Sequence, residues 1–439
     1  MGRGGRSGEE IDRQIPWDEI KKHNTRTDRW IVIEDKVYNV SEWAKKHPGG
    51  SAIMGHYAGQ DASEAFREFH KDKLKVSKYM APICIGNVVP KASADLDEEE
   101  IKKDFLQLRK IAEDMDLFKP SKVFFSLIVG HLIFFEILAY MTLYYFGTGW
   151  IPTMFSVLFY TIVQAEAGWS QHDFGHLSVF KSVKWNKILH SFVMNFLKGA
   201  SVSWWQHLHN QHHSKPNIIN KDPDVRLEKV FVLGKEIPKR VAENKNNIMP
   251  YNWQHRYFFL IGPPLLFPVF FQMMVFKHPI SRKNWLDVFI MCTFYLKVLI
   301  LYTPFYGVLG TCLYYFVVRC LESHWFVWVS QSNHIPMDIE DDKERPWLAL
   351  QLNATCDVEK SHFNDWFTGH LNFQIEHHCF PTMPRHNLYK IAPYVQSLCK
   401  KHGIEYKCKT LAGAFSDIVK SLKHSGEIWY AHYQSYHYK

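Results

Sequence analysis

An apolar run at residues 123–146 constrains the architecture of this chain more strongly than any other feature. It reads VFFSLIVGHLIFFEILAYMTLYYF. A helix rises about 1.5 Å per residue, so this run would extend about 36 Å and exceed the ~30 Å hydrocarbon core of a bilayer. A second apolar run, 151–165, follows a short uncharged link. The two runs predict a helical hairpin that crosses a membrane and returns the chain to its starting side.

Three further apolar runs follow, at 257–276, 285–303 and 305–321. Histidine-rich clusters lie before and after these three runs. If the clusters work together on one side of a membrane, an even number of spans must separate them, so one of the three runs should not cross. The run 285–303 carries Asp287 and Lys297, and we expect it to lie partly in the interface, because charged side chains are costly inside a bilayer. Four spans are therefore predicted, at about 123–146, 151–170, 257–276 and 305–325.

The segment before the first apolar run is polar to mixed. A polar tail at 1–16 comes first, and a linker at 91–121 leads into the first span. Within this linker, residues 93–118 repeat apolar side chains at helical spacing, which predicts an amphipathic helix. Such a helix can pack against neighbouring parts of the protein or lie on the membrane surface, and the sequence leaves both open.

The net charge and the cysteines indicate the cellular compartment of the protein and the class of partner it binds. The formal net charge is +8 over 439 residues, which fits the positive cytosolic face of a membrane protein better than a nucleic-acid footprint. The eight cysteines form no CxxC pair, so neither a disulfide framework nor covalent haem attachment is expected. These features favour a reducing compartment and no nucleic-acid partner.

Residues 17–90 predict a haem-binding module. The motif His47-Pro48-Gly49-Gly50 places a histidine beside a tight loop, and His70 follows in a second helical segment. Two neutral imidazoles from opposed helices can ligate a haem iron on both faces, which suits electron transfer because no position stays open for oxygen. This stretch resembles the cytochrome b5 family. The resemblance makes His47 and His70 the axial ligands of haem b, and we expect His56 to lie at the surface or the pocket edge.

The remaining histidines gather in three clusters whose spacing puts side chains on one helical face. More imidazoles are present than the three or four protein ligands of a catalytic zinc, so two metal ions are the economical interpretation. Imidazole suits several metals, and the electron-donating haem module favours iron. Helical spacing in the third cluster also nominates His370 and Gln374. The clusters contain His172 and His176, then His209, His212 and His213, then His377 and His378.

These three clusters match the histidine boxes of the membrane fatty acid desaturases. The preceding cytochrome b5-like module, with Gln374 opening the third box, resembles the front-end desaturases. The stretches AGWSQHDFGHLSVF and FNDWFTGHLNFQIEHH are similar to vertebrate acyl-CoA desaturases of the delta-6 and delta-5 type, with the delta-6 branch nearer. The resemblance implies that the seven box histidines hold a di-iron centre. It makes His334 a further candidate ligand, Gln374 a weak or water-mediated contact, and His207 a supporting residue.

The resemblance also implies the fold. We expect an N-terminal α+β cytochrome b5-like domain at 17–90, fused to an all-α polytopic membrane desaturase domain at 122–439. The membrane domain would have about four transmembrane helices and a cytosolic histidine-rich cap.

The implied reaction introduces a cis double bond between the carboxyl end and an existing double bond of a polyunsaturated long-chain acyl-CoA, using O2. The haem would relay electrons from NADH-cytochrome b5 reductase, because no GxGxxG fingerprint follows a strand here. The implied location is the endoplasmic reticulum membrane, with the N-terminus and the boxes cytosolic. A sphingolipid desaturase, a lipid hydroxylase and a non-catalytic haem- and metal-binding membrane protein remain alternatives. Departures from the family pattern at Phe196, Cys379 and the segment before the second box leave the regiochemistry open.

Overall fold

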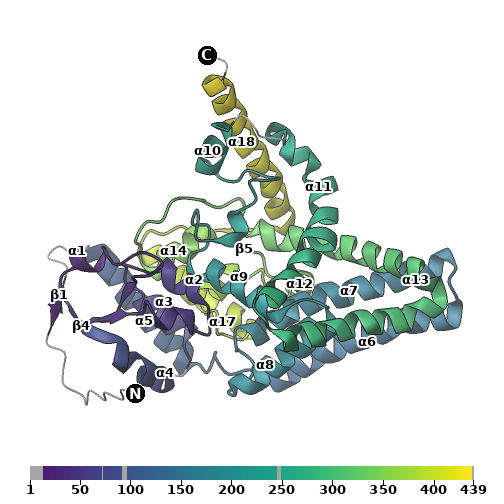
Figure 1. Cartoon of the computed structure of the whole chain (residues 1–439), viewed down its shortest axis with the longest axis horizontal. Helices are drawn as coiled ribbons and strands as arrows, with labels where there is room; N and C mark the ends of the chain where they lie inside the picture. Colours follow the sequence, from purple (N-terminus) through teal and green to yellow (C-terminus); the bar gives the residue numbers. More distant parts are fainter. Residues whose placement is uncertain (1–12, 72, 91–95, 245–248, 438–439) are drawn as a thin grey trace.

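The computed structural model describes residues 13–71, 73–90, 96–244 and 249–437 (Figure 1). A small domain of strands and short helices lies at one end, long antiparallel helices extend from the other, and an arm of helices projects between them. The fold class predicted from the sequence is confirmed: an α+β N-terminal domain precedes a mostly helical domain with several apolar helices.

The N-terminal domain is built on a four-stranded sheet with strand order β1-β4-β3-β2. Strands β2 and β3 form an antiparallel hairpin whose turn places Glu34 at a φ of 59°. One face of this sheet buries Ile15, Val32 and Val37 in a small apolar core. Its elements are β1 (Gln14–Ile15), α1 (Trp17–Ile20), β2 (Trp30–Ile33), β3 (Lys36–Asn39), η1 (Trp43–Lys45), α2 (Ser51–His56), α3 (Ser63–Phe69), α4 (Lys73–Met80), η2 (Ala81–Ile83) and β4 (Cys84–Val88).

The helix α5 (Leu96–Asp114) connects this domain to the rest of the chain. Residues 93–95 of the predicted amphipathic helix lie outside the described residues. The apolar face of α5 is buried, with Phe105 stacked on Phe380 at 5.3 Å between ring centroids. This face therefore packs against the protein, as one of the two sequence-based interpretations expected.

Three long helices, α6 (Lys122–Phe146), α7 (Trp150–Gly175) and α13 (Trp285–Ser332), form the extended end of the molecule (Figure 1). The chain reverses within α13 at Gly307, which has a φ of 68° and a ψ of 175°. As a result the rings of Tyr302 and Tyr314 stack at 4.6 Å. The segment before Gly307 therefore packs antiparallel to the segment after it, beside α6 and α7.

The run 285–303 was expected to lie partly in the interface because of its charges. The structure packs it as a helix beside α6 and α7, and its place in the membrane stays a prediction. The two charges that motivated that expectation are paired in the structure. Lys297 forms a salt bridge with Glu136 of α6, and Asp287 accepts hydrogen bonds from Asn195 and Ser201, which precede the helix α9 (Val202–Ser214). The number of charged residues in the run overestimates the free-energy cost of burying them, because the sequence does not show which groups pair with Asp287 and Lys297.

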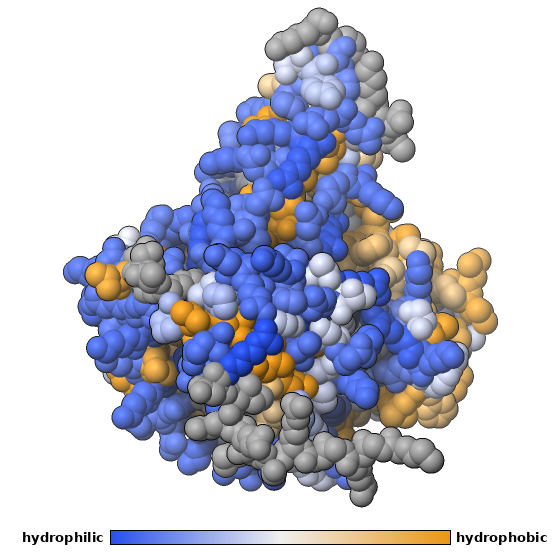
Figure 2. Space-filling model, turned by 60° about the vertical axis from the view of Figure 1, so that its left-hand side comes forward, coloured by the Kyte–Doolittle hydropathy of each residue, from blue (hydrophilic) through white to orange (hydrophobic). Residues whose placement is uncertain are grey.

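Within the described part of the chain, three helical stretches are long and apolar enough to cross a membrane: α6, residues 251–281, and α13. The helix α7, predicted as a span, is not among them by composition. Hydrophobic residues are concentrated over the end formed by the long helices, whereas the N-terminal domain and the projecting arm are largely hydrophilic (Figure 2). Leu309 and Phe146 at this end are 84% and 75% exposed, as expected for side chains that face lipid.

The remaining elements cover the inner ends of the long helices and build the arm. The arm consists of α10, α11 and α18 (Figure 1). These elements are α8 (Val183–Ser191), the π-helix η3 (Phe192–Leu197), α9 (Val202–Ser214), η4 (Pro223–Val225), α10 (Glu236–Ala242), η5 (Tyr251–Trp253), α11 (Gln254–Leu265), the π-helix η6 (Leu266–Phe271), α12 (Gln272–Ser281), α14 (Trp347–Ala354), β5 (Asp357–Val358), α15 (His362–Phe367), α16 (Gln374–Cys379), η7 (Arg385–Asn387), α17 (Leu388–Lys401), β6 (Cys408–Lys409) and α18 (Leu411–His437).

Candidate functional site

Five box histidines converge where α7, α9 and α16 meet. Each of His172, His176, His209, His213 and His377 offers one ring nitrogen, and these nitrogens all lie within 4.8 Å of one another. The Nε2 atom of His209 is 2.9 Å from that of His176 and 3.0 Å from that of His213. Nitrogen lone pairs that converge in this way match the donor set of a transition-metal ion.

Helix α9 presents three of the histidines because of how its start is held. Ser201 caps the helix by accepting a hydrogen bond from the Trp204 amide. The Asp287 carboxylate reinforces this end, accepting hydrogen bonds from the Val202 and Ser203 amides at 3.2 and 3.1 Å. A carboxylate at a helix N-terminus also complements the helix dipole. Asp287 therefore fixes the helix that carries the second box.

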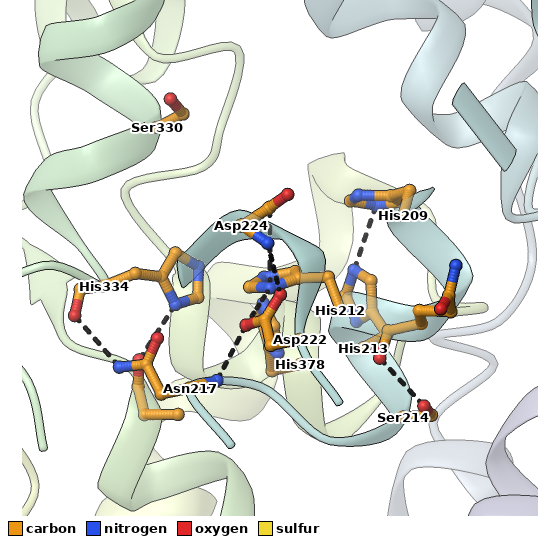
Figure 3. Close-up of polar contacts among 12 residues, drawn as sticks. His209, His212, His213, Ser214, Asn217, Asp222, Asp224, Ser330, His334 and His378 are labelled. Atoms are coloured by element: carbon orange, nitrogen blue, oxygen red, sulfur yellow. Dashed lines mark hydrogen bonds and ion pairs between the residues drawn. The ribbon is translucent and has the colours of Figure 1, made fainter. Parts of the chain in front are cut away.

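A second group lies beside the first and contains His212, His334 and His378, whose nitrogens are also mutually within 4.8 Å (Figure 3). The Nδ1 of His334 is 2.8 Å from the Ala354 carbonyl oxygen. The Nδ1 of His378 is 2.9 Å from Oε1 of Gln351. When the protein accepts the Nδ1–H of a histidine, Nε2 becomes the ligand atom.

Asp222 is the carboxylate that orients His212, and the sequence analysis missed it. Its Oδ2 lies 2.9 Å from Nδ1 of His212 and accepts a hydrogen bond from the Asn217 amide at 2.7 Å (Figure 3). Burial opposes a charge on His212, but Asp222 and the nearby Asp224 outweigh it and raise the pKa of His212 to about 9. The two carboxylates thus favour positive charge at this imidazole, from a proton or a metal. The acidic pair in the Asp222-Pro-Asp224 segment, shortly after the second box, was the available signal.

The other histidines of the two groups are held neutral. Burial, followed by the neighbouring His212, lowers the pKa of His334 to about 3. Burial and adjacent imidazoles hold the pKa values of His213, His377 and His378 well below the usual range. Neutral imidazole is the form that ligates metals. Nε2 of His378 is buried and has no hydrogen-bond partner among the described residues, which leaves it free for a metal ion.

The further residues that the sequence nominated near the metal site, Gln374, His370 and His207, lie at different positions relative to the two histidine groups. Gln374 borders the second group, with its amide nitrogen 2.8 Å from Nε2 of His334. His370 belongs to neither group and adopts a φ of 66°, its ring near Phe124. His207 also lies outside both groups, and its ring is 5.0 Å from that of His278.

The haem-site histidines face each other across the N-terminal domain. The ring centroids of His47 and His70 are 6.1 Å apart, close to the spacing of about 6 Å that two imidazoles sharing a metal at ~2 Å bonds require. Nδ1 of His70 lies 2.8 Å from the Phe66 carbonyl oxygen, which leaves Nε2 for iron. A Cβ at Gly49 would lie 2.9 Å from Cε1 of His47, so glycine keeps this ring in position. The residues present therefore fit a bis-histidine haem.

His56 does not lie at the surface, which was one of the two places expected for it. Its side chain is 6% exposed, and its Nδ1 is 2.7 Å from Oγ of Ser214, directly after the second box. It is a contact between the N-terminal domain and the helix α9. The sequence could not show this because the two residues are distant along the chain.

A fatty acid desaturase family model matches residues 148–410. The chain belongs to the fatty acid desaturase family. A model for the cytochrome b5-like heme/steroid binding domain matches residues 16–89. The solved cytochrome b5 of Ostreococcus tauri virus 2 is 39% identical, covering 17% of this chain and 95% of that chain, with a TM-score of 0.16.

The family assignment fixes the cofactors and the reaction class. The cytochrome b5-like domain binds haem, and the desaturase domain belongs to a family with a histidine-rich di-iron centre. The chain is thus an oxidoreductase, a desaturase that receives electrons through its own cytochrome b5 domain. This order of domains is consistent with a front-end desaturase.

Proposed function

We propose that this desaturase is a front-end acyl-CoA desaturase of the delta-6 type. It introduces a cis double bond between the carboxyl end and an existing double bond of a polyunsaturated long-chain acyl-CoA. The observation that carries the proposal is the pair of adjacent histidine groups, with a bis-histidine haem site in the same chain. A bilayer-facing end with exposed apolar side chains supports a lipid substrate.

We assign the residues as follows. The seven box histidines and His334 hold the two irons, Gln374 borders one of them, and His47 and His70 ligate the haem. Bound iron supplies the activation of O2 that removal of hydrogen from an unactivated methylene requires. The protein contributes orientation: Asp222 fixes His212, and Gln351 fixes His378. His370 and His207 receive no ligand role.

The electron balance requires an outside donor. Reduction of one O2 to two waters takes four electrons, of which the acyl chain supplies two as it becomes an alkene. The other two arrive singly through the haem site, from NADH-cytochrome b5 reductase. We place the enzyme in the endoplasmic reticulum membrane, with the N-terminus and the histidine groups on the cytosolic side. The proposed domain limits are a tail at 1–16, the haem domain at 17–90, the linker at 91–121 and the desaturase domain at 122–439.

The test is expression of the full chain in yeast fed linoleate or eicosatrienoate, with fatty acid profiles read by mass spectrometry. We expect linoleate to gain a double bond on its carboxyl side, whereas conversion of eicosatrienoate alone would contradict the delta-6 assignment. A hydroxylated product would indicate a lipid hydroxylase. Conversion only in the long-chain bases of sphingolipids would indicate a sphingolipid desaturase. No conversion by a protein that holds haem and iron would indicate a non-catalytic role.

A further inference from the structure

The haem domain is docked on the desaturase domain through polar and apolar contacts. The Tyr57 hydroxyl donates to the Ser214 carbonyl at 2.7 Å, and the Gln60 amide donates to Asp342 at 2.7 Å. A single buried apolar cluster runs from the haem domain into the C-terminal part of the chain, including Ile31 and Ile375. The two redox sites are therefore held in a defined relation to each other.

One residue of this interface contacts both sides at once. Trp347 begins α14 and is 2% exposed. Its amide donates to Oε2 of Glu64 in the haem domain at 2.7 Å. Its ring meets that of Phe69 edge to face, with centroids 5.8 Å apart. Its indole Nε1–H donates to the Cys379 carbonyl at 3.2 Å.

Two of the residues that Trp347 contacts are direct chain neighbours of proposed metal ligands. Phe69 directly precedes the haem-site histidine His70, and Cys379 directly follows the box histidine His378. The indole therefore lies between the chain neighbour of a haem-site histidine and the chain neighbour of a box histidine.

Two other connections cross the same interface. His56 and Tyr57 both bond Ser214, which follows His213, and Lys71, which follows His70, donates to the carbonyl of Leu177, which follows His176, at 2.7 Å. Neither places an aromatic side chain between the neighbour of a haem-site histidine and the neighbour of a box histidine, as Trp347 does.

We propose that Trp347 is the electron-transfer bridge from the haem site to the di-iron site, through Phe69 on one side and the Cys379 carbonyl on the other. This inference rests on the proposed function, because it requires both metal sites to be loaded. Each passage moves one electron: the ferrous haem is oxidised to ferric, one iron of the pair is reduced, and no atom is transferred. The reductase replaces the electron, and two passages with two solvent protons complete each reduction of O2.

The experiment uses the full-length protein with haem and iron bound and compares Trp347→Leu, which removes the ring system, with Trp347→Phe, which keeps a ring against Phe69. The haem is reduced through NADH and the reductase, mixed with O2 and acyl substrate, and its re-oxidation is followed by stopped-flow absorbance. We expect Trp347→Leu to slow re-oxidation by roughly tenfold or more, about 1.4 kcal/mol in activation free energy. We expect Trp347→Phe to fall between it and the wild type, because the indole hydrogen bond is lost. The haem spectrum and the iron content should not change.

Two controls separate a bridge from a structural role. Trp429→Phe removes another buried indole, in α18 of the arm, and should re-oxidise at the wild-type rate. A diffusible low-potential mediator that reduces the iron site directly should restore turnover in the Trp347 variants. If Trp347→Leu fails to bind haem or iron, Trp347→Phe decides the question.

Wild-type re-oxidation rates in the Trp347 variants would overturn the inference, as would turnover in these variants that the mediator does not restore. Product analysis of the wild-type protein in the same preparations tests the proposed function separately. A wild type that desaturates its substrate, with variants that re-oxidise normally, would reject the bridge alone. A wild type that re-oxidises its haem through Trp347 but forms no alkene would reject the proposed function alone.

Discussion

The buried Asp222 carboxylate lies 2.9 Å from Nδ1 of His212 and orients an imidazole whose ring centroid is 4.5 Å from that of His334 and 5.0 Å from that of His378. Carboxylate partners of this kind fix the tautomer of a metal-binding histidine and strengthen it as a ligand.

Replacing this carboxylate should weaken one metal site without affecting the haem. For Asp222→Asn we expect iron affinity at the second histidine group to fall by roughly 10–100-fold, because the ligand loses its orienting charge. Iron per protein, measured by plasma mass spectrometry at graded iron concentrations, checks this. The matched control is Asp224→Asn, since Asp224 is 3.6 Å from His212 and partly exposed. Equal iron binding by Asp222→Asn and the wild type would show that Asp222 is not needed.

The two metal sites should be separable by single substitutions. We expect His377→Ala to abolish desaturation and leave the haem absorption spectrum intact, because His377 contacts only box histidines among the ring pairs described here. We expect His70→Ala to remove the haem spectrum and leave iron bound. Absorbance spectra and iron analysis of the same preparations test both. A haem spectrum that survives His70→Ala would contradict the axial-ligand assignment.

Glycine at position 49 should be required for haem binding. A Cβ there would displace the His47 ring, which it approaches to 2.9 Å. We expect Gly49→Ala to weaken haem affinity by roughly tenfold or more, the usual cost of disturbing the support of a ligand. Haem titration followed by absorbance measures this. Gly130→Ala serves as the control, since an added Cβ there meets nothing within 4 Å.

The start of α9 should depend on the Asp287 carboxylate. We expect Asp287→Ala to destabilise the protein by about 1–3 kcal/mol, because buried hydrogen-bond donors lose their acceptor, and to lower iron content with it. Thermal unfolding of the detergent-solubilised protein measures the loss. Asp287→Asn keeps one acceptor oxygen and should lie between Asp287→Ala and the wild type. No change in either variant would show that Ser201 alone is sufficient to cap the helix.

Docking of the haem domain should weaken in acid because of His56. Burial, followed by the positive charge of Lys221, lowers the pKa of His56 to about 3, against about 6.5 in an unfolded chain. The folded pKa is depressed, so this contribution is complete above pH 6.5 and is lost as pH falls toward 3. At pH 5 the loss is about 2 kcal/mol.

Hydrogen–deuterium exchange of residues 51–60 at pH 7 and pH 5, corrected for intrinsic rates, measures this effect. Lys215, Lys221, Arg226 and Asp222 are the charged groups that act on His56. His56→Gln keeps a hydrogen-bonding group toward Ser214 and should lose most of the pH dependence. An unchanged pH response in that variant would assign the effect to these neighbouring groups.

Residue spacing along the chain predicted much of the site. His172 and His176, or His209 and His213, are one helical turn apart, so their common face followed from local geometry alone. The partners of the histidines did not follow. Gln351 and the Ala354 carbonyl are separated from His378 and His334 by about twenty or more residues, and only the packing of α14 brings them into contact.

The sequence by itself predicted a cytochrome b5-like haem module through its resemblance to that family. It also determined the three histidine clusters and the membrane-length apolar runs, because these depend on residue type and short-range periodicity. Only the tertiary structure decided that the segment before Gly307 packs among the long helices, since Lys297 needs Glu136 beside it to be tolerated there. It alone divided the histidines into two groups and placed Trp347 between the haem site and the box histidines. These relations depend on contacts between residues far apart along the chain, for which no local pattern exists.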